Sequence, residues 1–191
     1  MTRLPRLASL CLVLFATNAA SAADDLVDNP VYLSWAKLTK GASVTHKVVT
    51  TFAGQTINNE TTQTLLDINP DSATIELKTR SEVMGTMRDL PPQKTTIRAK
   101  VPRQQAENLS APGGAGGKTE PAGNETITVA GKSYDCKVFN ISGETNGMKS
   151  TGKLWRSEEV PGNIVRMDMD VEGAHAMNMV MELKEIKTVK N

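Results

Sequence analysis

The residues with the most distinctive chemistry lie near the C-terminus, where methionine recurs at every second position. Met167 and Met169 lie in one such stretch, and Met177, Met179 and Met181 lie in the next. Alternate residues of a β-strand share one face, so the two stretches predict neighbouring strands that present five thioethers to one side. Such a face has two chemical uses, because thioethers bind soft metal ions and also fill irregular apolar space.

Copper binding is the first of these uses. His175 precedes Met177 and Met179, and methionine and histidine are suitable ligands for Cu(I). Thioethers two residues apart on one strand are separated by about 7 Å, which is too far to ligate one ion unless the strand bends. Met167 or Met169 of the adjacent strand could complete the site. One hypothesis is therefore an envelope Cu(I) protein that uses His175, Met177 and Met179.

An apolar lining is the second use, and it requires no bending of the strand. Flexible thioethers would accommodate a lipid or another apolar small molecule of varied shape. We favour this interpretation over copper. The candidate lining residues are Met167, Met169, Met177, Met179, Met181 and Trp35. A third hypothesis is a structural envelope protein in which the same face is a closed core without a ligand.

The sequence contains no catalytic motif. Gly-x-Ser-x-Gly, His-Glu-x-x-His and paired-cysteine patterns are absent, and two histidines give little support to a zinc enzyme. Cys136 shares its predicted strand face with Tyr134 and Val138, which indicates a buried, unreactive thiol. We therefore expect a non-enzymatic protein without a cofactor.

The N-terminus predicts a secretory signal peptide at residues 1–22. Arg3 and Arg6 precede a short apolar segment, and Ala20-Ser21-Ala22 supplies the small residues of a cleavage site. Cleavage leaves one domain, 23–191, whose net charge is about −1 instead of +1. A nearly neutral chain argues against a nucleic-acid partner, and no further segment is apolar enough to span a membrane. We expect an exported protein, periplasmic or extracellular.

The rest of the chain predicts the elements that carry the methionines. Asn29-Pro30, followed by Val31, Trp35 and Leu38 at helical spacing, predicts a helix from Pro30 to Lys40. From residue 43 the alternation predicts about nine strands in sequential hairpins, and a Gly- and Pro-rich stretch at 110–123 predicts a flexible loop. The expected fold is mainly β, a curved antiparallel meander forming a half-barrel or partial barrel, with one N-terminal helix.

This order of elements resembles the periplasmic lipoprotein-carrier (LolA-like) superfamily. The shared features are a leader, an early helix, a curved meander and a mid-chain loop. The segment Trp155-Arg-Ser-Glu-Glu-Val-Pro-Gly, preceded by Tyr134-Asp-Cys136, also resembles uncharacterised exported bacterial proteins with a Trp-x-Ser-x-x-Val-Pro-Gly segment. The superfamily has no fixed signature to transfer residue by residue. The resemblance implies only a half-barrel with a lipid-holding cavity.

Overall fold

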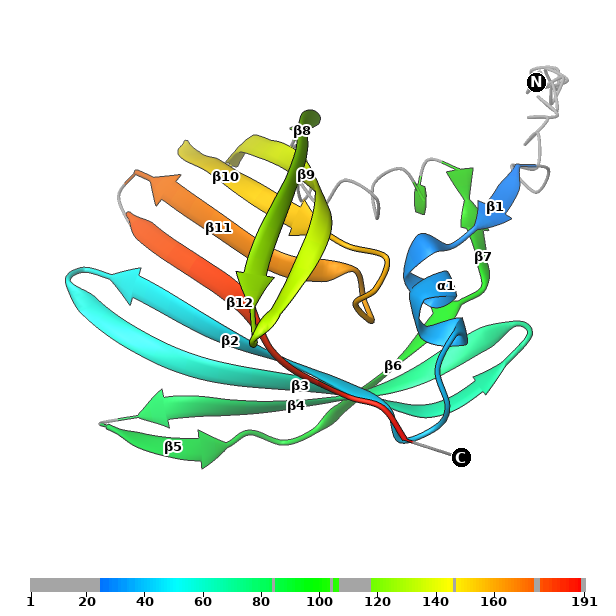
Figure 1. Cartoon of the computed structure of the whole chain (residues 1–191). Coiled ribbons are helices and arrows are strands. Elements are labelled where there is room, and N and C mark those ends of the chain that lie inside the picture. Colours follow the sequence, from blue (N-terminus) through cyan, green and yellow to red (C-terminus); the bar gives the residue numbers. More distant parts are fainter. Residues whose placement is uncertain are drawn as a thin grey trace, which may run out of the picture.

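The chain folds around one large antiparallel β-sheet with a short helix at its side (Figure 1). The computed structural model describes residues 25–83, 85–103, 105–106, 118–145, 147–173 and 176–189. The predicted signal peptide lies outside these residues. The helix is α1 (Pro30–Ala36). The strands are β1 (Leu26–Asp28), β2 (Ser43–Phe52), β3 (Gln55–Asn69), β4 (Ser72–Val83), β5 (Thr86–Asp89), β6 (Gln93–Arg98), β7 (Lys100–Pro102), β8 (Lys118–Val129), β9 (Lys132–Thr145), β10 (Met148–Arg156), β11 (Ile164–Glu172) and β12 (Met177–Lys187).

The strand order joins the two halves of the chain through its last strand. The large sheet has ten strands in the order β5-β4-β3-β2-β12-β11-β10-β9-β8, and β6 also pairs with β4. Neighbours within each half are sequential hairpins, as predicted, whereas β12 pairs with β2 from Met177 opposite Phe52 to Lys187 opposite Ser43. Within the described residues, the terminal strands β5 and β8 do not pair with each other, so the sheet stays open. The predicted mainly β partial barrel is thereby confirmed.

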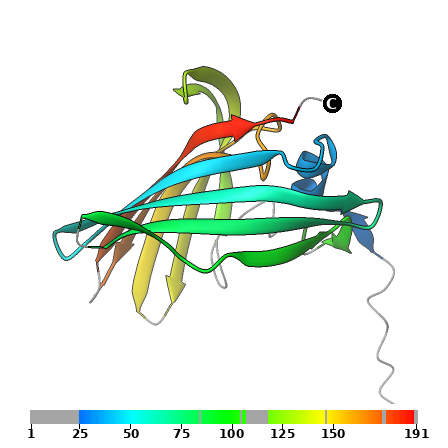
Figure 2. The same ribbon diagram turned by 90° about the horizontal axis from the view of Figure 1, so that it is seen from below.

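The sheet is curved, as Figure 2 shows from below, and its strand pairing has several local irregularities. The pairing register shifts between Leu65 and Asp67, between Pro121 and Gly123, between Trp155 and Arg156, and between Leu183 and Glu185. A bulge adds a residue to one strand and increases the local twist. Curvature therefore has identifiable sources on both halves of the sheet.

Several strand predictions need correction in detail. The described residues form twelve strands rather than about nine, because β1 and β7 pair as a separate two-stranded sheet and Pro91-Pro92 separates β5 from β6. Proline lacks the N–H that a strand ladder requires, yet β5 and β6 both pair with β4. Strand β8 begins at Lys118, inside the loop predicted for 110–123. The earlier part of that loop lies outside the described residues.

Helix α1 is shorter than predicted and ends at Ala36 instead of Lys40. Asn29 caps its start, since the Asn29 side chain accepts hydrogen bonds from the N–H groups of Val31 and Tyr32, and proline occupies the first turn. The N–H of Leu38 donates to the Trp35 carbonyl, an i to i−3 contact that tightens the last turn. Gly41 then adopts φ +92°, which redirects the chain into β2.

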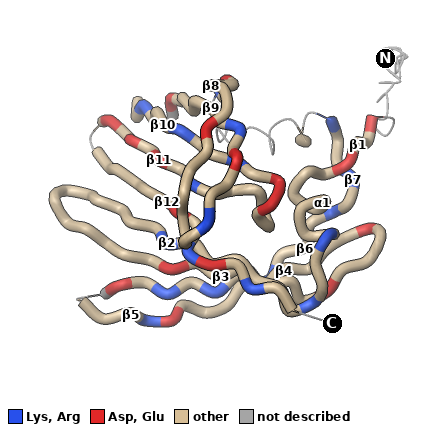
Figure 3. The backbone as a smooth tube through the Cα atoms, viewed as in Figure 1, with Lys and Arg blue, Asp and Glu red and all other residues tan. Residues whose placement is uncertain are grey.

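The core holds α1 against the sheet. Trp35 is 0% exposed and packs in one buried cluster with Val44, Leu65 and Ala73. The same cluster continues into the β8–β9 hairpin, whose tip approaches β12 (Figure 1). Charged residues of both signs are interspersed along the strands (Figure 3), as expected for a nearly neutral chain.

Candidate functional site

One face of the sheet carries two adjacent cavities. Cross-strand register places Phe139 opposite Leu154, Leu154 opposite Met167, and Met167 opposite Met181. Directly opposed residues share a face, and we call this face the inner face. Phe139 lines one cavity and Met181 lines the other. Both cavities therefore open on the inner face.

The larger cavity, which we call the helix cavity, lies between α1 and strands β8 to β10. Its volume is about 690 Å³, within the usual range of about 300–1,000 Å³ for small-molecule sites. Leu33 lines it while 45% exposed, so an apolar side chain of α1 meets solvent there. The lining residues are Pro30, Leu33, Ser34, Ala36, Lys37, Thr119, Pro121, Lys137, Phe139, Arg156, Ser157, Glu158 and Asn163.

The smaller cavity, which we call the sheet cavity, lies over β2, β3, β4 and β6. Its volume is about 360 Å³. The lining residues are Val31, His46, Thr61, Gln63, Ile75, Leu77, Thr95, Ile97, Arg156, Pro161, Gly162, Ile164 and Met181. Arg156 lines both cavities. Both cavities therefore reach the end of β10.

The turn at residues 157–163 separates the two cavities and is attached to α1. The Gly162 N–H donates to Ser34 Oγ at 2.9 Å, and Asn163 Nδ2 donates to the Pro30 carbonyl at 3.3 Å. Val160 is 0% exposed and anchors the turn in the core. The Trp-x-Ser-x-x-Val-Pro-Gly segment noted in the sequence thus forms the partition between the cavities and holds α1 in place.

The helix cavity contains buried polar groups among its apolar walls. Asn163 is 8% exposed, and its Oδ1 atom is buried without a hydrogen-bond partner among the described residues. The Thr119 Oγ1 atom is likewise buried without a hydrogen-bond partner among the described residues. Unpaired buried oxygens cost free energy, so these two atoms are polar sites within the cavity wall, and neither is itself accessible to solvent.

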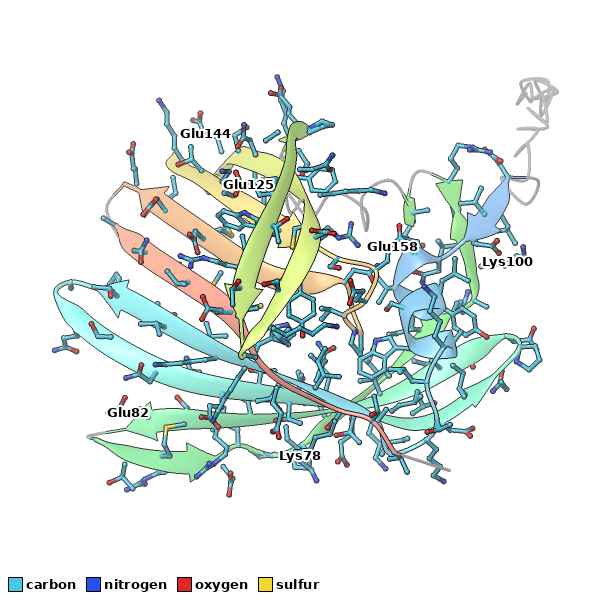
Figure 4. The ribbon with its side chains drawn as sticks, in the orientation of Figure 1. Lys78, Glu82, Lys100, Glu125, Glu144 and Glu158 are labelled. Atoms are coloured by element: carbon cyan, nitrogen blue, oxygen red, sulfur yellow. The ribbon has the colours of Figure 1, made fainter. Side chains whose placement is uncertain are left out.

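Three cations and one acid also line the helix cavity: Lys37, Lys137, Arg156 and Glu158. Figure 4 places Glu158 between the β8–β9 hairpin and α1. Lys137 Nζ lies 3.5 Å from Glu158 Oε1, and both side chains are more than 70% exposed. Arg156 is half-buried, and this burial lowers the pKa of its guanidinium group. The charged lining is therefore predominantly positive.

His46 is the titratable group of the sheet cavity. It is 5% exposed, and its Nε2 lies 2.9 Å from the Ile164 carbonyl oxygen. Because a carbonyl only accepts, Nε2 must carry the proton. Burial lowers the pKa of His46 from its usual value, and the hydrogen bond to Ile164 opposes that shift only in part. His46 is thus favoured as neutral in the folded protein.

A pH-dependent stability follows from His46. The unfolded chain, in which the histidine pKa is about 6.5, binds this proton more readily than the folded one does. The free energy of unfolding should therefore fall as the pH drops from about 7 to 5. The variant His46→Gln, which retains an N–H donor, should lose part of this fall in urea titrations at pH 7, 6 and 5. His175→Gln is the control, and identical pH profiles for wild type and His46→Gln would contradict the expectation.

The methionines form cross-strand pairs on the inner face. Met167 lies opposite Met181, Met169 opposite Met179, and Met177 opposite Val171, so the prediction of two neighbouring methionine strands is confirmed. Met181 lines the sheet cavity. The other four are partly exposed on the same face. Their contact with a ligand remains a prediction.

The other candidate residues lie in different surroundings. Trp35 is fully buried in the core, so in this conformation it supports α1 rather than the cavity surface. His175, the proposed copper ligand, lies outside the described residues. Within the parts of the chain that the structure describes, no group of three or more His, Cys, Asp or Glu could hold a metal ion. The thioether pairs thus remain the basis of the copper hypothesis.

Cys136 is buried at 2% exposure in the core of the β8–β9 hairpin. Burial is the main reason that its pKa is raised to about 11, and Asp135 adds to the effect. The thiol stays protonated at neutral pH, which makes it a poor nucleophile. Its surroundings are those expected of an unreactive core cysteine.

In the described part of the chain, no helix is both long and apolar enough to cross a membrane.

Sequence patterns indicated the methionine face but not the helix cavity. Lys137, Arg156 and Asn163 lie on β9, on β10 and in the following turn, and no periodicity relates them to α1. The one available signal was Pro161-Gly162-Asn163, a turn sequence in which Gly162 and Asn163 both adopt positive φ.

Comparisons with known proteins give matches among solved structures alone. Protein-family models give no match, and neither do curated protein sequences. A solved structure of a protein described as exported, with a YmcC-like fold, from Bacteroides fragilis is 12% identical with a TM-score of 0.49, and the match covers 79% of this chain and 97% of that one. A protein described as a lipoprotein from Parabacteroides distasonis is 16% identical with a TM-score of 0.46, covering 78% and 96%. A LolA superfamily protein from Nitrosomonas europaea is 10% identical with a TM-score of 0.24, covering 86% and 95%.

Proposed function

We propose that this is an exported, non-enzymatic protein that binds a lipid or another apolar ligand on the inner face of its sheet. The observation that carries the proposal is the helix cavity, whose volume is about 690 Å³ and whose walls include the partly exposed Leu33 together with Phe139 and Pro121. A closed structural core would leave no such space beside an exposed leucine. The leader at residues 1–22 supports export.

Binding would be driven by burial of the ligand's apolar surface. Each methylene removed from water contributes about 0.8 kcal/mol. The sheet cavity, which shares Arg156 with the helix cavity, offers a second apolar space that Met181 lines. Met167, Met169, Met177 and Met179 extend this face farther along the strands. Their flexible side chains would tolerate ligands of different shapes.

Native mass spectrometry tests this function directly. The full chain is expressed with its leader and purified from the exported fraction without detergent or chelator. We expect an added mass of several hundred daltons that organic solvent extracts. A mass near that of copper would instead support the methionine and histidine site. A bare polypeptide mass would favour the structural alternative.

A substitution in the helix cavity provides the matched test. Phe139→Asp places a carboxylate against the ligand's apolar chain, and an uncompensated charge in apolar surroundings is strongly unfavourable. Retained ligand should fall by at least about tenfold, which corresponds to about 1.4 kcal/mol. Asn140→Asp is the control, because Asn140 is the exposed neighbour on the opposite face of β9. Equal ligand retention in the two folded variants would count against the proposed site.

A further inference from the structure

The charged residues of the helix cavity do not balance. Lys37 follows the last residue of α1, Lys137 lies on β9 and Arg156 ends β10, whereas Glu158 is the one acid among the lining residues. These cations come from three separate elements, so no single strand or helix pattern accounts for their meeting. An apolar space bordered by convergent positive charge matches the two parts of an anionic amphiphile.

Arg156 is the best placed of the three cations. It lines both the helix cavity and the sheet cavity, and it is directly opposite Lys137 on β9 and Ile164 on β11. The residue is half-buried. A planar guanidinium in partly desolvated surroundings suits a carboxylate or phosphate, which can accept two parallel hydrogen bonds from it.

Lys137 can change partners at little cost. Its ion pair with Glu158 spans 3.5 Å, and the two side chains are 71% and 78% exposed. Exposed pairs of this kind contribute little to stability. The Lys137 ammonium group can therefore leave Glu158 for an anion inside the cavity.

We infer that the ligand of the helix cavity is an amphiphile with an anionic head, a carboxylate or a phosphate, bound by Lys37, Lys137 and Arg156. This inference rests on the proposed function and specifies its ligand class. The apolar chain lies against Leu33 and Phe139.

The test compares probes that share a chain and differ in the head. Delipidated full-length mature protein is dialysed to equilibrium against radiolabelled palmitate, hexadecanol or palmitoyl lysophosphatidic acid. Palmitate, the lysophosphatidic acid, or both should bind at least about tenfold more tightly than hexadecanol, as expected for a charge-assisted contact. Added salt should weaken only the charged probes. The tighter of the two charged probes identifies the head as carboxylate or phosphate.

Variants separate the head contact from the chain contact. The double variant Lys37→Gln/Lys137→Gln should lose most of the preference for the charged probes and bind hexadecanol unchanged. Lys78→Gln is the control, because Lys78 lies on β4 away from Glu158 and the helix cavity (Figure 4). Equal affinity for all three probes, or an unchanged preference in the double variant, overturns the inference but leaves apolar binding intact. Binding of none of the probes overturns the proposed function itself.

Discussion

Replacing Trp35 with alanine is expected to lower the free energy of unfolding by about 3–5 kcal/mol. Trp35 is 0% exposed and packs with Val44, Leu65 and Ala73, which belong to the sheet beneath α1. Its removal would leave a large void that the neighbouring strands cannot fill without breaking their hydrogen bonds. Because the seven-residue helix is too short to be stable alone, its attachment depends on this side chain.

Urea unfolding followed by circular dichroism measures this loss. Leu33→Ala is the matched control on the same helix, since Leu33 is 45% exposed and should cost less than about 1 kcal/mol. Trp35→Phe should cost less than Trp35→Ala, because it keeps most of the volume and removes a buried indole N–H that has no partner among the described residues. A loss below about 1 kcal/mol for Trp35→Ala would show that α1 is held by other contacts. Since α1 forms one wall of the helix cavity, ligand retention should fall together with stability.

Replacing Gly152 with valine is expected to cost about 3 kcal/mol. Gly152 lies on β10 opposite Met169 of β11 and Ile141 of β9. A Cβ atom there would clash with the Asp168 carbonyl oxygen and lie 3.0 Å from Met169 Cγ and 3.2 Å from Met169 Cα. The first of these obstacles is backbone, so relief would require separating paired strands. The missing side chain at Gly152 is what allows Met169 to lie against β10.

The adjacent residue offers a control for Gly152→Val. Thr151→Val alters an exposed position of the same strand and replaces one β-branched residue with another, so stability should change by less than about 0.5 kcal/mol. The two variants are compared by thermal and urea unfolding. A folded Gly152→Val protein of wild-type stability would mean that β10 and β11 can separate without loss, contrary to the close contact described above.

Much of the local structure was predictable because it depends on near neighbours. Alternation at Met167 and Met169 and again at Met177 and Met179 specifies which residues share a face, and a hairpin between them must bring the two rows together. The start of α1, with Asn29 as its N-cap and Pro30 as its first residue, was equally predictable from the sequence. The C-terminal end of α1 was not readable in the same way, because the turn signal that the sequence offers lies at Gly41, where the chain enters β2.

By itself, the sequence determined an open antiparallel sheet with one helix, a buried cysteine and a methionine-bearing face, since each depends on periodicity or composition. Only the tertiary structure decided that β12 pairs with β2 and that the turn at 157–163 is bonded to α1. It also decided that Lys37, Lys137 and Arg156 meet at one cavity. The first two of these contacts join residues more than a hundred positions apart, and the geometry of all three depends on sheet curvature summed over many strands and bulges. No local sequence pattern determines this accumulated curvature, so the candidate ligand site could be identified only in the folded chain.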